Sequence, residues 1–173
     1  MAALVFLFRN PTRPVPSVPL AVVSPVDGSV VAVETGQDPY LHREAVRVRL
    51  HPGIFGVYFP RSPIEARVMQ VWSVSNMRGP GSNADATSRP RSTALWLRSD
   101  EGDDVTIVLT PRRGTAARCY VQTGQRLGQG QRCGYLPFAQ EAELMLPPNA
   151  RVRVGAGDSV VAGSDILATL VHK

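Results

Sequence analysis

The stretch Ala45-Val46-Arg47-Val48-Arg49-Leu50 alternates apolar residues with arginines. A period of two places the apolar side chains on one face of an extended strand and the arginines on the other. Fifteen glycines and fifteen prolines punctuate other short apolar runs, and no helical period of apolar residues persists over three or four turns. The sequence therefore predicts an all-β fold, or a mainly β fold with short helices.

Further strands are predicted wherever a short apolar or alternating run is bounded by Gly, Pro, Asn or Asp. The full set of predicted strands is Leu20–Val23, Ser29–Val33, Ala45–Leu50, Gly56–Phe59, Arg67–Val74, Ala94–Arg98, Val105–Thr110, Ala117–Gln122, Glu143–Leu146, Arg151–Val154 and Ile166–Leu170. One long segment, Met77–Arg91, is poor in apolar residues, and a loop of that length is either a lid over a site or a mobile segment.

The composition fits one globular domain spanning residues 1–173, because 43% of the positions are hydrophobic and 19% are charged. No apolar run approaches the roughly 18 to 20 residues that a membrane helix needs, and the apolar start ends at Arg9. That start also lacks the pattern of a secretory signal. We therefore expect a cytoplasmic protein without an integral membrane segment.

The formal charge of +5 comes almost entirely from arginines, since Lys173 is the only lysine. The arginines are spread singly along the sequence instead of forming a stripe interleaved with aromatics, which argues against nucleic-acid binding. Cys119 and Cys133 lack CxxC spacing, and the three histidines are far apart. No metal site is expected, and the two cysteines are predicted to be free thiols.

Two segments share a turn pattern. Residues 24–31 place a Pro-x-Asp-Gly turn between two strands, and residues 152–168 repeat Val-x-x-Gly around tight turns. Both segments are similar to the halves of a barrel-sandwich hybrid, the small β fold that biotinyl and lipoyl carriers also use. A carrier role is not expected, because those domains present a lysine at a hairpin tip and Lys173 is terminal.

Several motifs, read in order, resemble those of the short bacterial phosphatidylserine decarboxylases over nearly the whole chain. Residues 6–16 (FLFRNPTRPVP) are similar to an opening Phe-x-Phe-Arg-Asp-Pro-x-Arg, and residues 23–28 (VSPVDG) to a Ser-Pro-Ala-Asp-Gly turn. Residues 61–68 (RSPIEARV) resemble Asn-Arg-x-Pro-x-x-Gly-x-Val, and residues 130–138 (GQRCGYLPF) resemble the run leading into the family's self-cleavage site. Leu146-Pro147 and the Gly-rich tail complete the order, which implies the family's fold.

The resemblance implies a proenzyme in which a serine hydroxyl attacks the carbonyl of the preceding glycine. The serine then becomes an N-terminal pyruvoyl ketone, which accepts electrons during decarboxylation. At the matching position this chain has Phe138-Ala139-Gln140-Glu141. A carboxamide is a poor nucleophile and cannot eliminate to a ketone, so we predict neither cleavage at this position nor a pyruvoyl cofactor.

The residues that would assist the cleavage are also altered. Asp27 matches the family's aspartate, but Tyr58 stands where the resemblance places a histidine. Tyrosine, with a reference pKa of about 10, is a poor general base at neutral pH. Asp27 itself has either a functional role or the structural role of capping its own turn.

The resemblance implies that the remaining residues line one pocket. We take Tyr58, Gln140 and Asp27 as candidate catalytic residues. The candidate ligand-binding residues are Phe55, Phe59, Phe138, Glu141 and Arg91. The aromatic members are equally explained as core residues, since only 6% of the chain is aromatic.

Three functions follow from these observations. In the first, a repurposed protein binds an apolar, lipid-like or polyketide-like molecule and catalyses a cofactor-free cyclisation in specialised metabolism. In the second, a pseudoenzyme without catalysis serves as a scaffold, and a homo-oligomer is compatible with either function. In the third, an orthodox phosphatidylserine decarboxylase uses another serine, although cleavage at Gly163-Ser164 would leave only a ten-residue fragment and Gly28-Ser29 and Gly81-Ser82 lie far from the expected site. The first is the expectation that we carry forward.

Overall fold

The computed structural model describes residues 12–54, 56, 58–75 and 91–171. Phe55, most of the opening motif and the segment between residues 76 and 90 lie outside the described residues. Within the described part the chain forms strands and no helix, which confirms the all-β fold class. The strands are β1 (Ala21–Val23), β2 (Gly28–Asp38), β3 (Arg43–Pro52), β4 (Ala66–Ser75), β5 (Arg91–Arg98), β6 (Asp104–Pro111), β7 (Arg118–Cys119), β8 (Arg126–Leu127), β9 (Gly134–Tyr135), β10 (Ala139–Leu146), β11 (Arg151–Val152), β12 (Ser159–Val160) and β13 (Ile166–Thr169).

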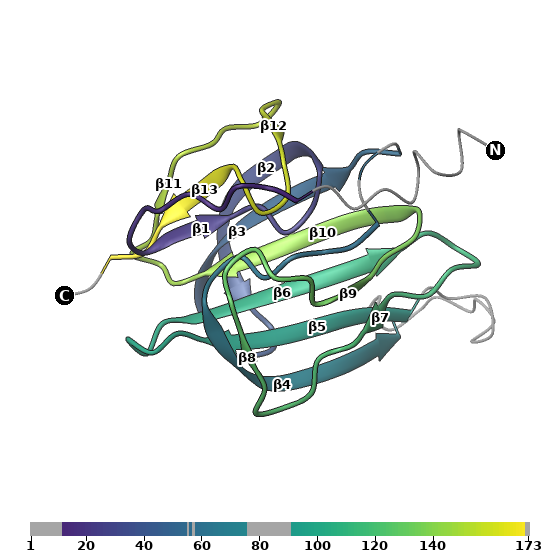
Figure 1. The fold of residues 1–173 in the computed structure, drawn as a ribbon, viewed down its shortest axis with the longest axis horizontal. Helices are drawn as coiled ribbons and strands as arrows, with labels where there is room; N and C mark the ends of the chain where they lie inside the picture. The colour runs from purple at the N-terminus through teal and green to yellow at the C-terminus, as the bar shows by residue number, and fades with distance from the viewer. Residues whose placement is uncertain (1–11, 55, 57, 76–90, 172–173) are drawn as a thin grey trace.

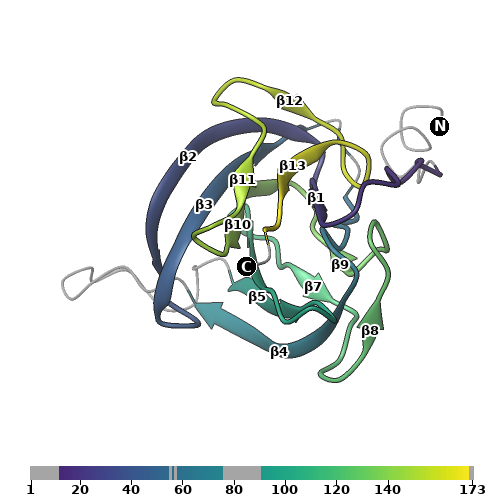
Figure 2. The same cartoon turned by 90° about the vertical axis from the view of Figure 1, so that its left-hand side faces the viewer.

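The strands form three antiparallel sheets. The largest has eight strands in the order β12-β2-β3-β10-β6-β5-β4-β8, and the others have the orders β1-β13-β11 and β7-β9. Figures 1 and 2 show the large sheet curling into a half-barrel, with the two small sheets on its concave side. None of the described elements is a helix of the length and hydropathy needed to cross a membrane.

The predicted alternation in β3 sets the two faces of the large sheet. Val48 and Leu50 are fully buried, whereas Arg47 and Arg49 are partly exposed. Val48 pairs with Leu144 of β10 on one side and with Val33 of β2 on the other. The concave face is filled mainly by Leu, Ile and Val side chains from the eight-stranded and three-stranded sheets and from the loops between strands, so burial of this face is the main source of stability.

Several predicted strand boundaries are wrong. Of the predicted strand 56–59, the described residues Gly56, Tyr58 and Phe59 are not in a strand, because a turn closed by the Gly56 N to Gly53 O hydrogen bond (2.9 Å) precedes them. The predicted strand 117–122 shrinks to β7, and β10 begins at Ala139 instead of Glu143. The two-residue strands β8, β9 and β12 were missed because so few residues carry no periodic signal.

The two segments with related turns meet in space, as the resemblance to a barrel-sandwich hybrid implies. The Ser24 amide donates to the Asp165 carbonyl, and the Val30 amide donates to that of Asp158, both at 2.8 Å. The Gly163 amide donates to the Ser24 carbonyl, also at 2.8 Å. Three backbone hydrogen bonds therefore hold the first turn against the C-terminal turns and fix the loop that carries Asp27.

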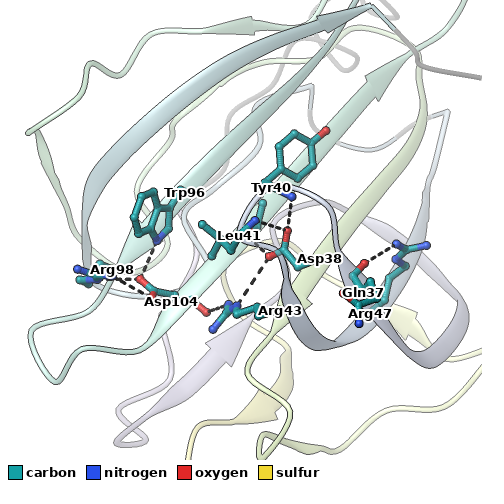
Figure 3. Close-up of polar contacts among 10 residues, drawn as sticks. Gln37, Asp38, Tyr40, Leu41, Arg43, Arg47, Trp96, Arg98 and Asp104 are labelled. Carbon is teal, nitrogen blue, oxygen red and sulfur yellow. Dashed lines mark hydrogen bonds and ion pairs between the residues drawn. The ribbon is translucent and has the colours of Figure 1, made fainter.

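A buried carboxylate joins the turn after β2 to the middle of the large sheet (Figure 3). Asp38, with no exposed surface, accepts hydrogen bonds from the Tyr40 amide (2.9 Å), the Leu41 amide (3.2 Å) and the Thr106 hydroxyl (2.9 Å). The guanidinium of Arg43 lies 3.9 Å away and also donates to the Asp104 carbonyl. The carboxylate is thus satisfied by partners from both β2–β3 and β6.

The Asp38→Ala variant is expected to lose about 3 kcal/mol of unfolding free energy, because it leaves Thr106 and two amides without their acceptor and removes the carboxylate that faces the Arg43 guanidinium. Urea denaturation followed by circular dichroism measures this loss. Glu44→Ala, an exposed position six residues further along the chain, is the control and should change the free energy by less than about 0.5 kcal/mol. Equal effects in the two variants would contradict the role given to Asp38.

Candidate functional site

Asp27 lies in the loop between β1 and β2, and its carboxylate is bound by residues distant in sequence. Arg13 donates to both carboxylate oxygens, with Nη2 at 2.7 Å from Oδ2. The Ala162 amide donates to Oδ1 at 2.7 Å. The hydrogen bond from Arg13 to Asp27 raises the pKa of Arg13. These contacts fix the orientation of the carboxylate and link it to the C-terminal turns.

A small cavity of about 10 Å³ opens beside Asp27. Its lining residues are Val26, Asp27, Pro52, Gly53, Tyr58, Pro60, Leu136 and Ala139. This space has room for about one water molecule. Within the described residues the space beside Asp27 is therefore much smaller than a lipid-like ligand.

Tyr58 is 5% exposed and forms one wall of this cavity. Its hydroxyl donates to the Ile54 carbonyl at 3.2 Å. Burial, with a smaller contribution from Tyr135, raises the pKa of Tyr58. The side chain therefore remains a protonated phenol at neutral pH and acts as a hydrogen-bond donor instead of a base.

Phe138 and Phe59 lie in two separate aromatic pairs. The ring of Phe138 is 5.3 Å from that of Tyr58, and the ring of Phe59 is 5.5 Å from that of Tyr135. Phe138 is half exposed and has a positive φ of 47°, a conformation that costs energy in a residue with a large side chain. The strain falls immediately before the Ala139–Gln140 bond.

The backbone at Gln140 lies close to the cavity, as the resemblance implied. Ala139 lines the cavity with Asp27 and Tyr58, whereas the Gln140 side chain is exposed. The carbonyl of Gln140 lies 3.2 Å from Nδ1 of His51. The family's pyruvoyl group does not fit this chain at position 140, because the residue there carries a carboxamide and no hydroxyl. We derive no reaction step through that group.

Of the remaining predicted ligand residues, Glu141 is not among the residues that line the cavity. Glu141 accepts a hydrogen bond from Nε of Arg49 at 3.0 Å, as a pair across β10 and β3. Arg91 begins β5, which is two strands away from β10 in the large sheet. Phe55 lies outside the described residues. The sequence motifs located the cavity, but they did not locate all of the residues around it.

The structure also brings together segments that carry three arginines distant from one another in the sequence. Residues 58–62 run beside residues 130–136, joined by hydrogen bonds such as Cys133 N to Pro60 O at 2.9 Å. Within this ladder Arg61 and Arg132 pair directly in a β-bridge. Arg13 reaches the same region through Asp27. Each of the three arginines lies inside a different family-like motif, and this was the sequence signal that could have pointed to them. Their wide separation along the chain hid the fact that these segments meet.

The fold and these motif positions define the class of protein. A sequence model of the phosphatidylserine decarboxylase family matches residues 2–168, and the chain belongs to this family. The phosphatidylserine decarboxylase proenzyme of Nitrosomonas eutropha is 38% identical over 164 residues, covering 93% of this chain and 75% of the relative. The proenzymes of Aromatoleum aromaticum and Burkholderia ambifaria are each 38% identical over 170 residues, covering 96% of this chain and 78% of each relative. No solved structure gives a significant match.

These relatives overturn the functional expectation drawn from the sequence. A repurposed protein that binds an apolar metabolite and catalyses a cofactor-free cyclisation is wrong, because similar proteins over almost the whole chain are phosphatidylserine decarboxylase proenzymes. The interpretations as a pseudoenzyme and as a protein of specialised metabolism are wrong for the same reason. The altered residues at positions 58 and 140 were given more weight than the rest of the chain supports.

Proposed function

We propose that the protein acts on phosphatidylserine and removes the carboxylate of its serine head group as carbon dioxide. The observation that carries this proposal is the 38% identity to phosphatidylserine decarboxylase proenzymes over more than nine tenths of the chain. The Asp27 cavity adds support, because it brings together segments from three of the family-like motifs. The head group would bind beside this cavity, which itself has room for about one water molecule.

The residues present at the cavity suit recognition of a charged head group. Asp27 is held by Arg13 and the Ala162 amide, so its carboxylate is fixed in direction and its charge is paired with a guanidinium. Tyr58 is a protonated phenol of raised pKa whose proton is donated to the Ile54 carbonyl, so its oxygen remains able to accept a hydrogen bond from the head group.

Decarboxylation also needs an electron acceptor, and residue 140 does not supply one. Two other Gly-Ser pairs in the described chain lie next to Asp27. Gly28-Ser29 follows Asp27 directly, and Gly163-Ser164 follows Ala162, whose amide binds the Asp27 carboxylate. Gly81-Ser82 lies outside the described residues. If the protein is a phosphatidylserine decarboxylase, Ser29 and Ser164 are therefore the candidate sources of the electron acceptor.

The purified protein is expected to release carbon dioxide and form phosphatidylethanolamine when it is mixed with phosphatidylserine vesicles. Product lipid is measured by mass spectrometry, and the intact mass of the protein is recorded on the same sample. The Ser29→Ala and Ser164→Ala variants then test the two candidate serines, and loss of product in one of them would identify the source of the electron acceptor. A folded wild-type protein that forms no phosphatidylethanolamine would overturn the proposal.

A further inference from the structure

A second cleft lies at the three-stranded sheet of β1, β13 and β11, whose strands run side by side in Figures 1 and 2. It has a volume of about 390 Å³. Its lining residues are Leu20, Arg151, Arg153, Thr169, Leu170 and Val171. As described, this set shares no member with the residues that line the cavity beside Asp27. Because sites for small molecules range from about 300 to about 1,000 Å³, this cleft has the size of a ligand site.

Two arginines stand on the same side of β11 and its continuation. Arg151 pairs with Thr169 of β13. The Arg153 amide donates to the Leu167 carbonyl at 2.8 Å, so the pairing continues past the end of β11. Residues two apart on an extended strand point to the same side, and Val152 between them packs against the core. Both arginines line the cleft and are exposed, and among the residues that the structure describes neither forms an ion pair with a carboxylate.

The rest of the cleft is mainly apolar. Leu20, Leu170 and Val171 contribute to its wall, and the Leu170 amide donates to the Leu20 carbonyl at 2.8 Å. Leu20 has a positive φ of 58°, a conformation that costs energy in a residue with a large side chain. The Thr169 hydroxyl is buried and has no hydrogen-bond partner among the described residues. Rotation about χ1 would exchange this hydroxyl with the methyl group and allow it to donate to an acceptor in the cleft.

We propose that this cleft binds an anionic phospholipid, with the lipid phosphate held by Arg151 and Arg153 and the start of its acyl chains against Leu20 and Val171. Arginine forks match the geometry of phosphate oxygens and form charge-assisted hydrogen bonds with them. The apolar wall adds hydrophobic contact that a free phosphate ion could not use. The inference does not depend on the proposed function, because it concerns a lipid bound outside the cavity beside Asp27.

The test uses the whole protein and a soluble lipid, dihexanoyl phosphatidylglycerol below its micelle concentration, which has no serine group. Two analogues divide this probe: glycerophosphoglycerol lacks the chains, and dihexanoylglycerol lacks the phosphate. In calorimetric titrations, wild-type protein is expected to bind the probe at least about tenfold more tightly than either analogue. Equal affinity for the probe and glycerophosphoglycerol would show that the apolar wall contributes nothing, and equal affinity for the probe and dihexanoylglycerol would exclude a phosphate site. Either result would overturn the proposal.

Variants at exposed positions locate the binding. The double variant Arg151→Gln and Arg153→Gln should bind the probe at least about tenfold more weakly than wild type and should not gain melting temperature when the probe is added. The double variant Arg67→Gln and Arg118→Gln is the matched control, because it removes the same charge from exposed positions outside the cleft, and it should bind as wild type does. Equal weakening in the two variants would indicate an effect of net charge alone and would refute the cleft.

The outcome is also separable from a charged membrane surface and from the proposed function. Binding to phosphatidylglycerol vesicles without binding to the soluble probe would indicate a membrane surface as the partner and would overturn the cleft. If no phosphatidylethanolamine forms but probe binding depends on Arg151 and Arg153, the proposed reaction fails and the lipid cleft remains. If phosphatidylethanolamine forms while the variant of both arginines binds the probe as tightly as wild type does, the reaction stands and the lipid cleft is refuted.

Discussion

The triple variant Tyr58→His, Ala139→Gly and Gln140→Ser is expected to cut itself into fragments 1–139 and 140–173, whereas the wild-type chain keeps the bond between Ala139 and Gln140. The structure supports this expectation because Ala139 shares the cavity with Asp27 and Tyr58. The positive φ of Phe138 places backbone strain directly before the bond. The missing elements are then a hydroxyl nucleophile and a base, which the three substitutions supply.

Denaturing mass spectrometry of the two purified proteins gives the result directly. Wild-type protein should contain no fragment of residues 1–139, and in the triple variant the second fragment should begin with a ketone that reacts with a carbonyl reagent. The control is the variant Tyr58→His, Ala139→Gly and Gln140→Ala. It differs from the first variant only in lacking the hydroxyl at position 140. A wild-type chain cut before residue 140 with a keto-blocked amino end would refute our interpretation of Gln140.

The fold was largely predictable because its strongest signals are local. The alternation in residues 45–50 predicts the two faces of β3, and both faces are found as expected. The turn around Asp27 also follows from its short motif. Strands of only two residues, such as β9, could not be predicted, because long-range pairing with β7 defines them and no local period does.

The candidate site was predicted only in part, for a similar reason. Asp27 and Tyr58 were found because each lies in a recognisable motif, and both line the same cavity. The pairing of Arg61 with Arg132 depends on the register of two segments about seventy residues apart, which no single motif contains. The function was misjudged because two replaced side chains received more weight than the order of motifs along the chain.

Gly28→Ala is expected to be among the most damaging single substitutions in the described chain. A Cβ at position 28 would lie 2.0 Å from the carbonyl oxygen of His51 and 2.9 Å from the Cα of Pro52. Both contacts are with backbone atoms of β3, so no side-chain rotation can relieve them. The loss of unfolding free energy should reach about 3 kcal/mol, the upper end for overpacking of a core, and denaturant unfolding measures it.

Gly36→Ala is the matched control, because Gly36 belongs to the same strand and an added Cβ would meet no atom within 4 Å. This variant should be neutral or stabilised by about 0.5 kcal/mol, since alanine restricts the unfolded chain. The contrast also bears on function. The close approach of Gly28 to β3 holds Asp27 against the next turn, where the Gly53 amide donates to the Asp27 carbonyl at 2.9 Å. Gly28→Ala should therefore weaken head-group binding even at temperatures where the variant remains folded, and unchanged binding would show that the position of Asp27 does not depend on this contact.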